Sequence, residues 1–166
     1  MTGPRTALGR ITHFFHRKPD FIIGGEEDPY LLRWWVIPRN RLFNIYLHKF
    51  LRDDDDRALH DHPWASLSIV LRGGYFEHMP FRLAYRPVGS VIFRRATAAH
   101  RISLDARGAY DQHGNFVEQV TVHAWTLFIT GPRVREWGFH CPQGWRHWKE
   151  FTAPDDSSRV GKGCEP

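Results

Sequence analysis

The sequence predicts an all-β fold, an antiparallel sandwich or barrel of the jelly-roll kind. Three observations support this class. Glycine and proline, with 14 and 11 residues among the 166, interrupt the chain at short intervals, and these residues mark turns. The runs between them are short and rich in β-branched and aromatic residues, and long helical periodicity is absent. Several short strands with regular turns in one chain are typical of closed antiparallel folds.

The elements are expected in the following order. An N-terminal extension, residues 1–30, precedes the barrel and includes a short amphipathic stretch at 8–15, so it is expected to be helical or irregular. The barrel takes residues 31–153, and the polar residues 154–166 are expected to form a flexible tail. Residues 105–114 contain Asp, Gly and Gln and predict a hairpin loop. The predicted strands are residues 31–37, 42–51, 65–71, 75–78, 90–93, 99–104, 117–129 and 134–140.

The composition limits the class of protein. A chain of 166 residues forms one domain and buries roughly 70% of the surface that its unfolded form exposes. With 42% hydrophobic and 25% charged residues, it is neither a disordered chain nor a collagen-like repeat. No run approaches the roughly 20 apolar residues that cross a bilayer, and no secretory signal pattern is present, so no membrane partner is expected. Cys141 and Cys164 cannot form a disulfide framework, so a reducing compartment, the cytoplasm, is expected.

The charge of the chain favours anionic partners. Lysine and arginine number 23 against 18 aspartate and glutamate, which gives a formal net charge of +5. Such an excess attracts phosphates and carboxylates. The basic residues are spread over the whole chain, and no nucleic-acid-binding motif accompanies them, so a small molecule is expected rather than nucleic acid.

Histidine supplies the most specific pattern. His60 and His62, two residues apart in extended chain, project from the same face and can converge on one ion. Gly73 follows His62 by eleven residues, and His100 follows Gly89 by the same interval. This order resembles the two motifs of the cupin superfamily, a family of jelly-roll barrels in which the HxH pair and the later histidine bind a metal ion.

The resemblance covers about residues 42–140 and departs from the family pattern at several positions. Ser66 occupies the position of the metal-binding glutamate. Asp54, Arg95, Thr97 and Leu104 stand where the family has a glycine, a proline, a second glycine and an asparagine. The resemblance therefore implies three imidazole ligands and no carboxylate ligand.

Three neutral imidazoles leave the charge of a divalent metal uncompensated, so the open positions favour an anionic substrate. Imidazole binds several divalent metals, so zinc, manganese and nickel are alternatives to iron at this site. A zinc ion held by three histidines would serve hydrolysis. The resemblance favours iron(II), because three-histidine cupins include mononuclear non-haem iron dioxygenases that act on thiols and diketones. It leaves open a non-catalytic ligand- or metal-binding cupin, a metal-free sugar-nucleotide epimerase-like cupin, and a homodimer.

Alternation along the strand after His62 predicts one wall of the substrate pocket. Trp64, Ser66, Ser68 and Val70 are expected on the ligand face, with the intervening residues on the opposite face. The two serines can donate hydrogen bonds to a substrate or serve only as small packing residues. Trp64 is expected to be buried.

Other candidates surround the ligands. Tyr75 and Glu77 are the catalytic candidates, although an exposed position on the strand is expected for Glu77 and a metal-ligand or general-base role is the alternative. Arg94 or Arg95 can clamp a substrate carboxylate. His140 is a further pocket candidate.

Three further features are expected to be structural. His48 is expected to be a hydrogen-bonded interior histidine, and the acidic residues 53–56 a solvated run. The aromatic segment 137–148 is expected to seal the barrel end against residues 33–35, with a cap over the barrel mouth as the alternative.

Overall fold

Strands account for nearly all the regular structure. The computed structural model describes residues 17–54, 58–152 and 163–165. In this part of the chain no helix is long and apolar enough to cross a bilayer. The elements are β1 (Phe21–Ile23), β2 (Leu31–Trp35), β3 (Asn44–Phe50), β4 (Leu59–His60), β5 (Ser66–Arg72), β6 (Gly74–Met79), β7 (Arg82–Pro87), β8 (Val91–Arg94), β9 (Arg101–Tyr110), β10 (Phe116–Val122), β11 (Ala124–Thr130), β12 (Gly138–Cys141), β13 (Gly144–His147) and the helix α2 (Trp148–Phe151).

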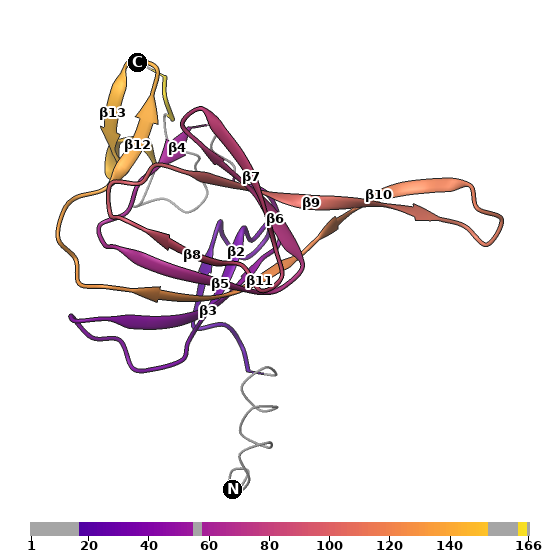
Figure 1. Cartoon of the computed structure of the whole chain (residues 1–166), viewed down its shortest axis with the longest axis horizontal. Coiled ribbons are helices and arrows are strands. Elements are labelled where there is room, and N and C mark those ends of the chain that lie inside the picture. The colour runs from indigo at the N-terminus through magenta and orange to yellow at the C-terminus, as the bar shows by residue number, and fades with distance from the viewer. Residues whose placement is uncertain (1–16, 55–57, 153–162, 166) are drawn as a thin grey trace, which may run out of the picture.

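Two antiparallel sheets form the body of the molecule (Figure 1). One has the strand order β1-β2-β3-β11-β5-β8 and the other β10-β9-β6-β7. A backbone bridge between His60 and His100 adds β4 beside the start of β9. Along the chain, β3, β5, β8 and β11 therefore alternate with β4, the β6–β7 pair and β9 between the two sheets. This alternation is the jelly-roll strand order, which confirms the predicted fold class.

The barrel interior has an apolar end and a polar end. Ser66, Ser68 and Val70 are buried, whereas Leu67 and Ile69 are only partly buried, as the predicted alternation requires. Eight buried side chains from both sheets fill the apolar end: Leu31, Phe50, Val70, Tyr75, Ile92, Ile102, Leu104 and Ala124. Burial of such side chains supplies the main stabilisation of the barrel.

Several element boundaries differ from the prediction. The predicted strand 117–129 is two strands that meet at His123, where the chain passes from one sheet to the other. The short strands β1, β4, β7 and β13 were not predicted. β1 pairs with β2, so the sheet begins ahead of residue 31. The predicted amphipathic stretch at residues 8–15 lies outside the described residues.

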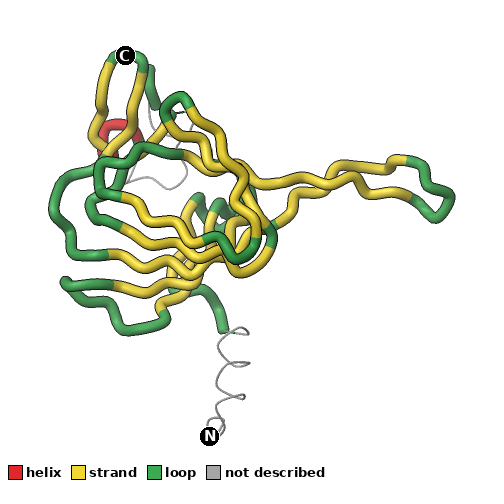
Figure 2. The backbone as a smooth tube through the Cα atoms, viewed as in Figure 1, coloured by secondary structure: helices red, strands yellow, loops and turns green. Residues whose placement is uncertain are grey.

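The predicted hairpin loop at residues 105–114 is too long, because only residues 111–114 form the turn. Residues 105–110 continue β9 and pair with β10 from Asp105↔Val122 to Tyr110↔Phe116. The two strands form a long ribbon that extends away from the body (Figures 1 and 2). Backbone pairing with a second strand outweighs the turn preference of Asp105 and Gly108.

The C-terminal part of the chain packs over one end of the barrel as a small separate sheet, β13-β12-β4. Its core consists of Ala58, Phe139 and Phe151. Cys141 and Cys164 form a disulfide between the β12–β13 hairpin and the C-terminal residues. This bond differs from the reducing setting inferred from the cysteine count, and it holds residues 163–165 of the predicted tail in place. The remainder of that tail lies outside the described residues.

Candidate metal centre

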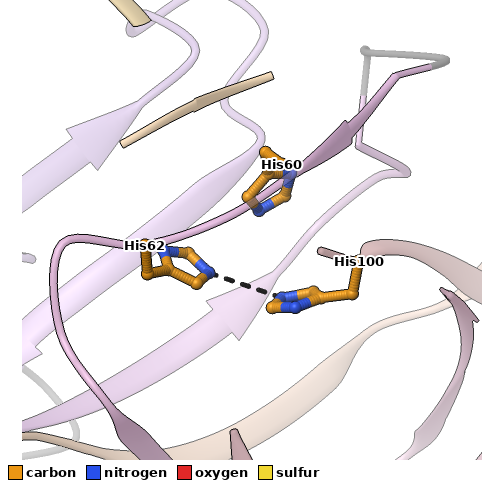
Figure 3. A group of neighbouring side chains, drawn as sticks. All are labelled: His60, His62 and His100. Atoms are coloured by element: carbon orange, nitrogen blue, oxygen red, sulfur yellow. Dashed lines mark hydrogen bonds between the residues drawn. The ribbon is translucent and has the colours of Figure 1, made fainter. Parts of the chain in front are cut away.

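The three predicted histidines come together at the polar end of the barrel. One ring nitrogen from each of His60, His62 and His100 lies within 4.8 Å of the others, and the Nε2 atoms of His62 and His100 are 3.4 Å apart. Figure 3 shows the three rings turned toward one another. Divalent metals bind histidine nitrogens at about 2.0–2.1 Å, so nitrogens at these separations can share one ion after small side-chain movements.

The backbone positions these rings. His60 and His100 form a narrow antiparallel bridge, in which each backbone N–H donates to the other residue's carbonyl at 2.9 Å. The His62 N–H donates to the Ala96 carbonyl, which fixes the second histidine against the loop that precedes His100. The HxH segment and the later histidine are therefore held together by main-chain hydrogen bonds.

The electrostatic setting favours the neutral form of two of the three imidazoles, His62 and His100. Burial lowers the pKa of His62 well below 6.5, and the neighbouring His60 and Arg94 lower it further. The pKa of His100 is lowered well below 6.5 by the same causes. Nδ1 of His60 lies 3.5 Å from an Asp54 carboxylate oxygen, so this acid lies close enough to help orient the ring. Part of the predicted solvated acidic run thus lies beside the site.

Asp61, between the first two ligands, anchors the loop. Asp61 is 1% exposed, and its side chain accepts hydrogen bonds from the Gly138 N–H at 2.9 Å and the Trp145 Nε1 at 3.1 Å. Arg135 forms an ion pair with it at 2.8 Å, and Nε2 of His140 lies 3.2 Å away. His140, a predicted pocket residue, therefore faces Asp61 from outside the barrel.

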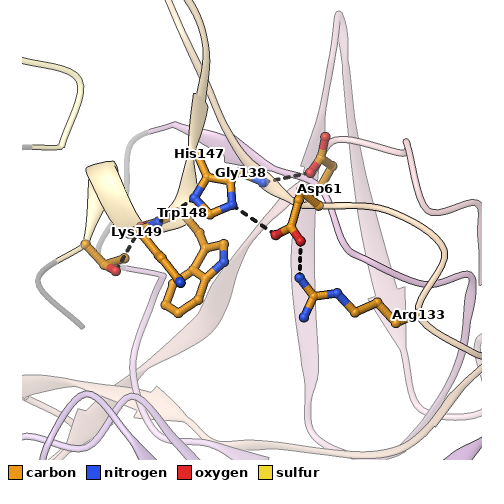
Figure 4. A network of polar contacts seen from close by, with 8 residues as sticks. Asp61, Arg133, Gly138, His147, Trp148 and Lys149 are labelled. Atoms are coloured by element: carbon orange, nitrogen blue, oxygen red, sulfur yellow. Dashed lines mark hydrogen bonds and ion pairs between the residues drawn. The ribbon is translucent and has the colours of Figure 1, made fainter. Parts of the chain in front are cut away.

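A second polar network continues from this anchor (Figure 4). Glu136 accepts hydrogen bonds from Arg133 and from His147 Nε2, the latter at 3.0 Å. Nδ1 of His147 accepts the Lys149 N–H and so caps α2. These contacts fix the segment that leads into Gly138.

Trp137 covers the histidines. Its ring stacks on His62, with centroids 6.3 Å apart, and on Trp148 at 5.7 Å. The aromatic segment therefore caps the barrel mouth, and the expectation that it seals against residues 33–35 is wrong. Trp34 stacks instead on Trp125, because both side chains lie on the outer face of the first sheet.

Hydroxyl groups lie on the interior faces of β5 and β11. Ser66, Ser68, Thr126 and Thr130 are all buried. In the described part of the chain, the Ser66 and Thr126 hydroxyls have no hydrogen-bond partner. Buried polar groups are normally satisfied, so these two can donate to a bound molecule. Trp64 stacks on His62 but is only partly buried, in contrast to the prediction.

Glu77 occupies the interior, and the expectation that it is exposed is wrong. It is 1% exposed, and its carboxylate accepts from Arg94 Nε at 2.5 Å and from Arg86 Nε at 2.7 Å. Arg94 also donates to the Tyr75 hydroxyl at 3.3 Å. Arg95, the other arginine candidate, is exposed. These contacts bear on two predicted roles. The Glu77 carboxylate is engaged by two arginines and is not a free general base, and the Arg94 guanidinium is already paired with Glu77 instead of free to bind a substrate carboxylate.

Arg33 was not predicted as a site residue. It lies opposite His48 on neighbouring strands and donates from Nε to His48 Nε2 at 2.8 Å, which confirms His48 as a hydrogen-bonded interior histidine. Its guanidinium lies over the Tyr46 ring, 4.8 Å from the centroid. No described carboxylate forms an ion pair with Arg33, and burial lowers its pKa. Strand alternation from buried His48 was the signal that could have identified it.

Comparison with known proteins gives structural neighbours only. No family model and no curated protein sequence matches the chain. Structural neighbours include the EutQ protein of Clostridium difficile (11% identity, TM-score 0.44, 68% of this chain and 75% of that chain). An uncharacterized conserved protein of Klebsiella pneumoniae with a double-stranded β-helix domain matches at 11% identity and a TM-score of 0.47, over 66% and 83%. KdgF from Halomonas sp. matches at 14% identity and 0.45, over 66% and 87%.

The strand order itself shows the fold. The strands β3-β11-β5-β8 face a second sheet in which β4, β9, β6 and β7 are neighbours. His60, His62 and His100 gather at one mouth of the resulting barrel. The chain forms a jelly-roll barrel with a three-histidine cluster at its mouth.

Proposed function

We propose that this protein is a mononuclear non-haem iron enzyme, a dioxygenase that acts on a small anionic substrate bound in the barrel. The observation that carries the proposal is the cluster of three imidazoles inside a barrel that also contains an arginine without a carboxylate partner among the described residues.

The donor set fits a divalent transition metal. Three histidine nitrogens with no carboxylate among them suit iron, zinc, manganese and nickel, and they leave coordination positions open. His60, His62 and His100 would hold the ion, with Asp54 orienting His60. A bound iron(II) ion would supply the redox chemistry of a dioxygenase.

Arg33 makes the site selective for a negatively charged substrate. Its Nε is used by His48, but the terminal nitrogens of the guanidinium make no ion pair with a described carboxylate. A guanidinium binds a carboxylate through two parallel hydrogen bonds, and the low polarity of the surroundings strengthens this contact. With a divalent ion nearby, the pocket carries net positive charge, which favours a substrate with a carboxylate or a similar anionic group.

The remaining residues position the substrate and exclude water. Ser66 and Thr126 have hydroxyls available for hydrogen bonds to the substrate. Trp137 covers the mouth and keeps water from the reacting atoms. Glu77 acts as a positioning residue, because it holds Arg94 against the hydroxyl of Tyr75.

Metal analysis tests the proposal. Protein purified without a histidine tag is expected to contain stoichiometric iron, or to bind it after anaerobic reconstitution, and His60→Ala, His62→Ala and His100→Ala each are expected to lose it. His113→Ala is the matched control, because His113 is exposed in the ribbon turn. Oxygen consumption with thiol carboxylates and diketones then tests the reaction. A wild-type protein that takes up none of Fe(II), Zn(II), Mn(II) or Ni(II) would overturn the proposal of a metal enzyme. Stoichiometric zinc together with hydrolytic activity would overturn the assignment as a dioxygenase.

Arg33 is tested separately. Arg33→Gln is expected to retain the metal and to raise KM for an anionic substrate by roughly 10- to 100-fold, the effect of losing a hydrogen bond to a charged group. A neutral analogue of the same substrate should lose no more than a few-fold. Equal losses for both substrates would show that Arg33 does not bind the anionic group.

The compartment in which the protein acts is proposed to be the cytoplasm. The cytoplasm would keep Cys141 and Cys164 as thiols, because reducing compartments keep cysteines reduced, whereas the structure pairs them in a disulfide. Thiol blocking at the moment of cell lysis, followed by mass spectrometry, distinguishes the two states. Fully blocked cysteines support the cytoplasm, and a disulfide contradicts it.

A further inference from the structure

A second concentration of positive charge lies outside the barrel. A cavity of about 430 Å³ opens where the β9–β10 ribbon joins the body, and its lining includes Lys49, Arg72, Arg107 and His123. None of the acidic residues that the structure describes lines it. Its volume is in the range of small-molecule sites, about 300–1,000 Å³.

Strand register explains how these groups meet. Trp125 on β11 lies opposite Lys49 on β3 and opposite Arg72 at the end of β5. The Lys49 ammonium lies 5.5 Å from the centre of the Trp125 ring. Lys49 alternates along β3 with the buried His48 and Phe50, so Lys49 and the residues opposite it face away from the barrel interior. The cavity is therefore separate from the three histidines.

The crossing between the sheets completes the cavity. Gly73 has a φ of +70°, and a Cβ there would lie 2.4 Å from the His123 carbonyl oxygen, so only glycine fits. This close approach places Arg72 beside His123. Arg107 reaches the same cavity from β9 at the base of the ribbon.

The charges in this cavity have no internal complement. Lys49, Arg72 and Arg107 form no ion pair with any carboxylate in the described ranges. Three like charges around one cavity repel one another, and a bound anion removes that repulsion. Partial burial lowers the pKa of His123, and the nearby Lys49 lowers it further. A single carboxylate would neutralise only one of the three cations.

We propose that this cavity binds a small phosphorylated molecule that carries at least two negative charges. Arginine guanidinium groups match phosphate oxygens through paired hydrogen bonds, and lysine adds a point charge. Since Arg107 belongs to the ribbon and the other cations belong to the body, the ligand also fixes the base of the ribbon against the barrel.

Titration calorimetry at fixed ionic strength tests this site, with inorganic phosphate, pyrophosphate, tripolyphosphate and a sugar phosphate as probes. Tripolyphosphate or pyrophosphate is expected to bind more tightly than inorganic phosphate. Arg72→Gln and Arg107→Gln are each expected to weaken binding about tenfold or more. Arg82→Gln, which removes an exposed arginine from β7, is the matched control and should leave binding unchanged. His62→Ala should also leave it unchanged, which separates this site from the metal centre.

Three results would overturn the proposal. The first is the absence of binding by every phosphate probe. The second is equal weakening by Arg82→Gln, which would mean a general effect of net charge. The third is a single-stranded oligonucleotide that binds much more tightly than tripolyphosphate and responds to the same variants, because the cavity would then be part of a nucleic-acid surface.

Discussion

Replacement of Glu77 by glutamine tests the buried ion pairs most directly. The substitution keeps the shape of the side chain but removes the charge that Arg94 contacts at 2.5 Å and Arg86 at 2.7 Å. The side chains of Glu77 and Arg94 are 2% and 6% exposed, so water cannot replace the lost partner of Arg94, whereas Arg86 is 22% exposed and can be partly hydrated.

The expected effect follows from these exposures. Removing one partner of a buried ion pair costs about 3–5 kcal/mol. The glutamine oxygen can still accept one hydrogen bond, so about 3 kcal/mol is expected for Glu77→Gln. At this chain length each kcal/mol lowers Tm by about 2–4 °C, which gives a loss of roughly 6–12 °C.

Calorimetric melting and urea unfolding measure this loss, with Glu118→Gln on the exposed face of β10 as the control. A double-mutant cycle with Arg94→Gln should give a coupling of at least about 1 kcal/mol. Metal content should not change, because Glu77 is not a ligand. A Tm within about 2 °C of wild type would refute the ion-pair reasoning, and loss of metal without loss of stability would identify Glu77 as a ligand.

Three further predictions concern other parts of the structure. Acid should destabilise the protein. Burial lowers the pKa of His48 well below its unfolded value of 6.5, so the unfolded chain takes up a proton at a higher pH than the folded chain does. The free energy of unfolding should therefore fall by up to about 1.4 kcal/mol per pH unit for that group as pH drops below 6.5. Urea unfolding at pH 7 and 5.5 measures this, and equal stabilities would contradict it. Reduction of the Cys141–Cys164 disulfide, with a sequence separation of 23, should cost about 3 kcal/mol by the chain-entropy model and lower Tm in dithiothreitol; an unchanged Tm would show that the bond does not constrain the unfolded chain. Asp61→Asn should weaken metal binding about tenfold, because Asp61 fixes the loop between His60 and His62; unchanged affinity in a metal titration would show that the anchor does not affect the ligands.

The sequence predicted the ligand cluster and the strand pattern because both depend on short-range regularities. His60 and His62 share a face through simple alternation, and the same alternation predicted the burial of Ser66, Ser68 and Val70. The chain order of the jelly roll follows from the number and spacing of short strands.

The polar interior was harder to predict, because its partners are distant in sequence. Arg94 is 17 residues from Glu77, and Arg33 is 15 residues from His48. A lone glutamate on a strand is usually exposed, and only a cross-sheet partner makes its burial favourable. The signal was nevertheless present, since Glu77 has the same parity as the buried Tyr75.

The length of the ribbon and the disulfide were missed for different reasons. Residues 105–110 of β9 are mostly exposed, so they show no apolar alternation that would extend the predicted strand 99–104. The disulfide depends on the β12–β13 hairpin bringing Cys141 to Cys164, and a pair of cysteines does not by itself indicate whether they meet.

The position of β10 at the end of its sheet has a consequence for solubility. A strand in that position exposes unpaired backbone groups along one edge, and such edges can recruit strands from other molecules into aggregates. The register shift between Phe116 and Glu118 interrupts the regular ladder near the tip, and the Glu118 charge lies at the same place. The irregular, charged edge of β10 therefore protects the projecting ribbon against growth by strand addition.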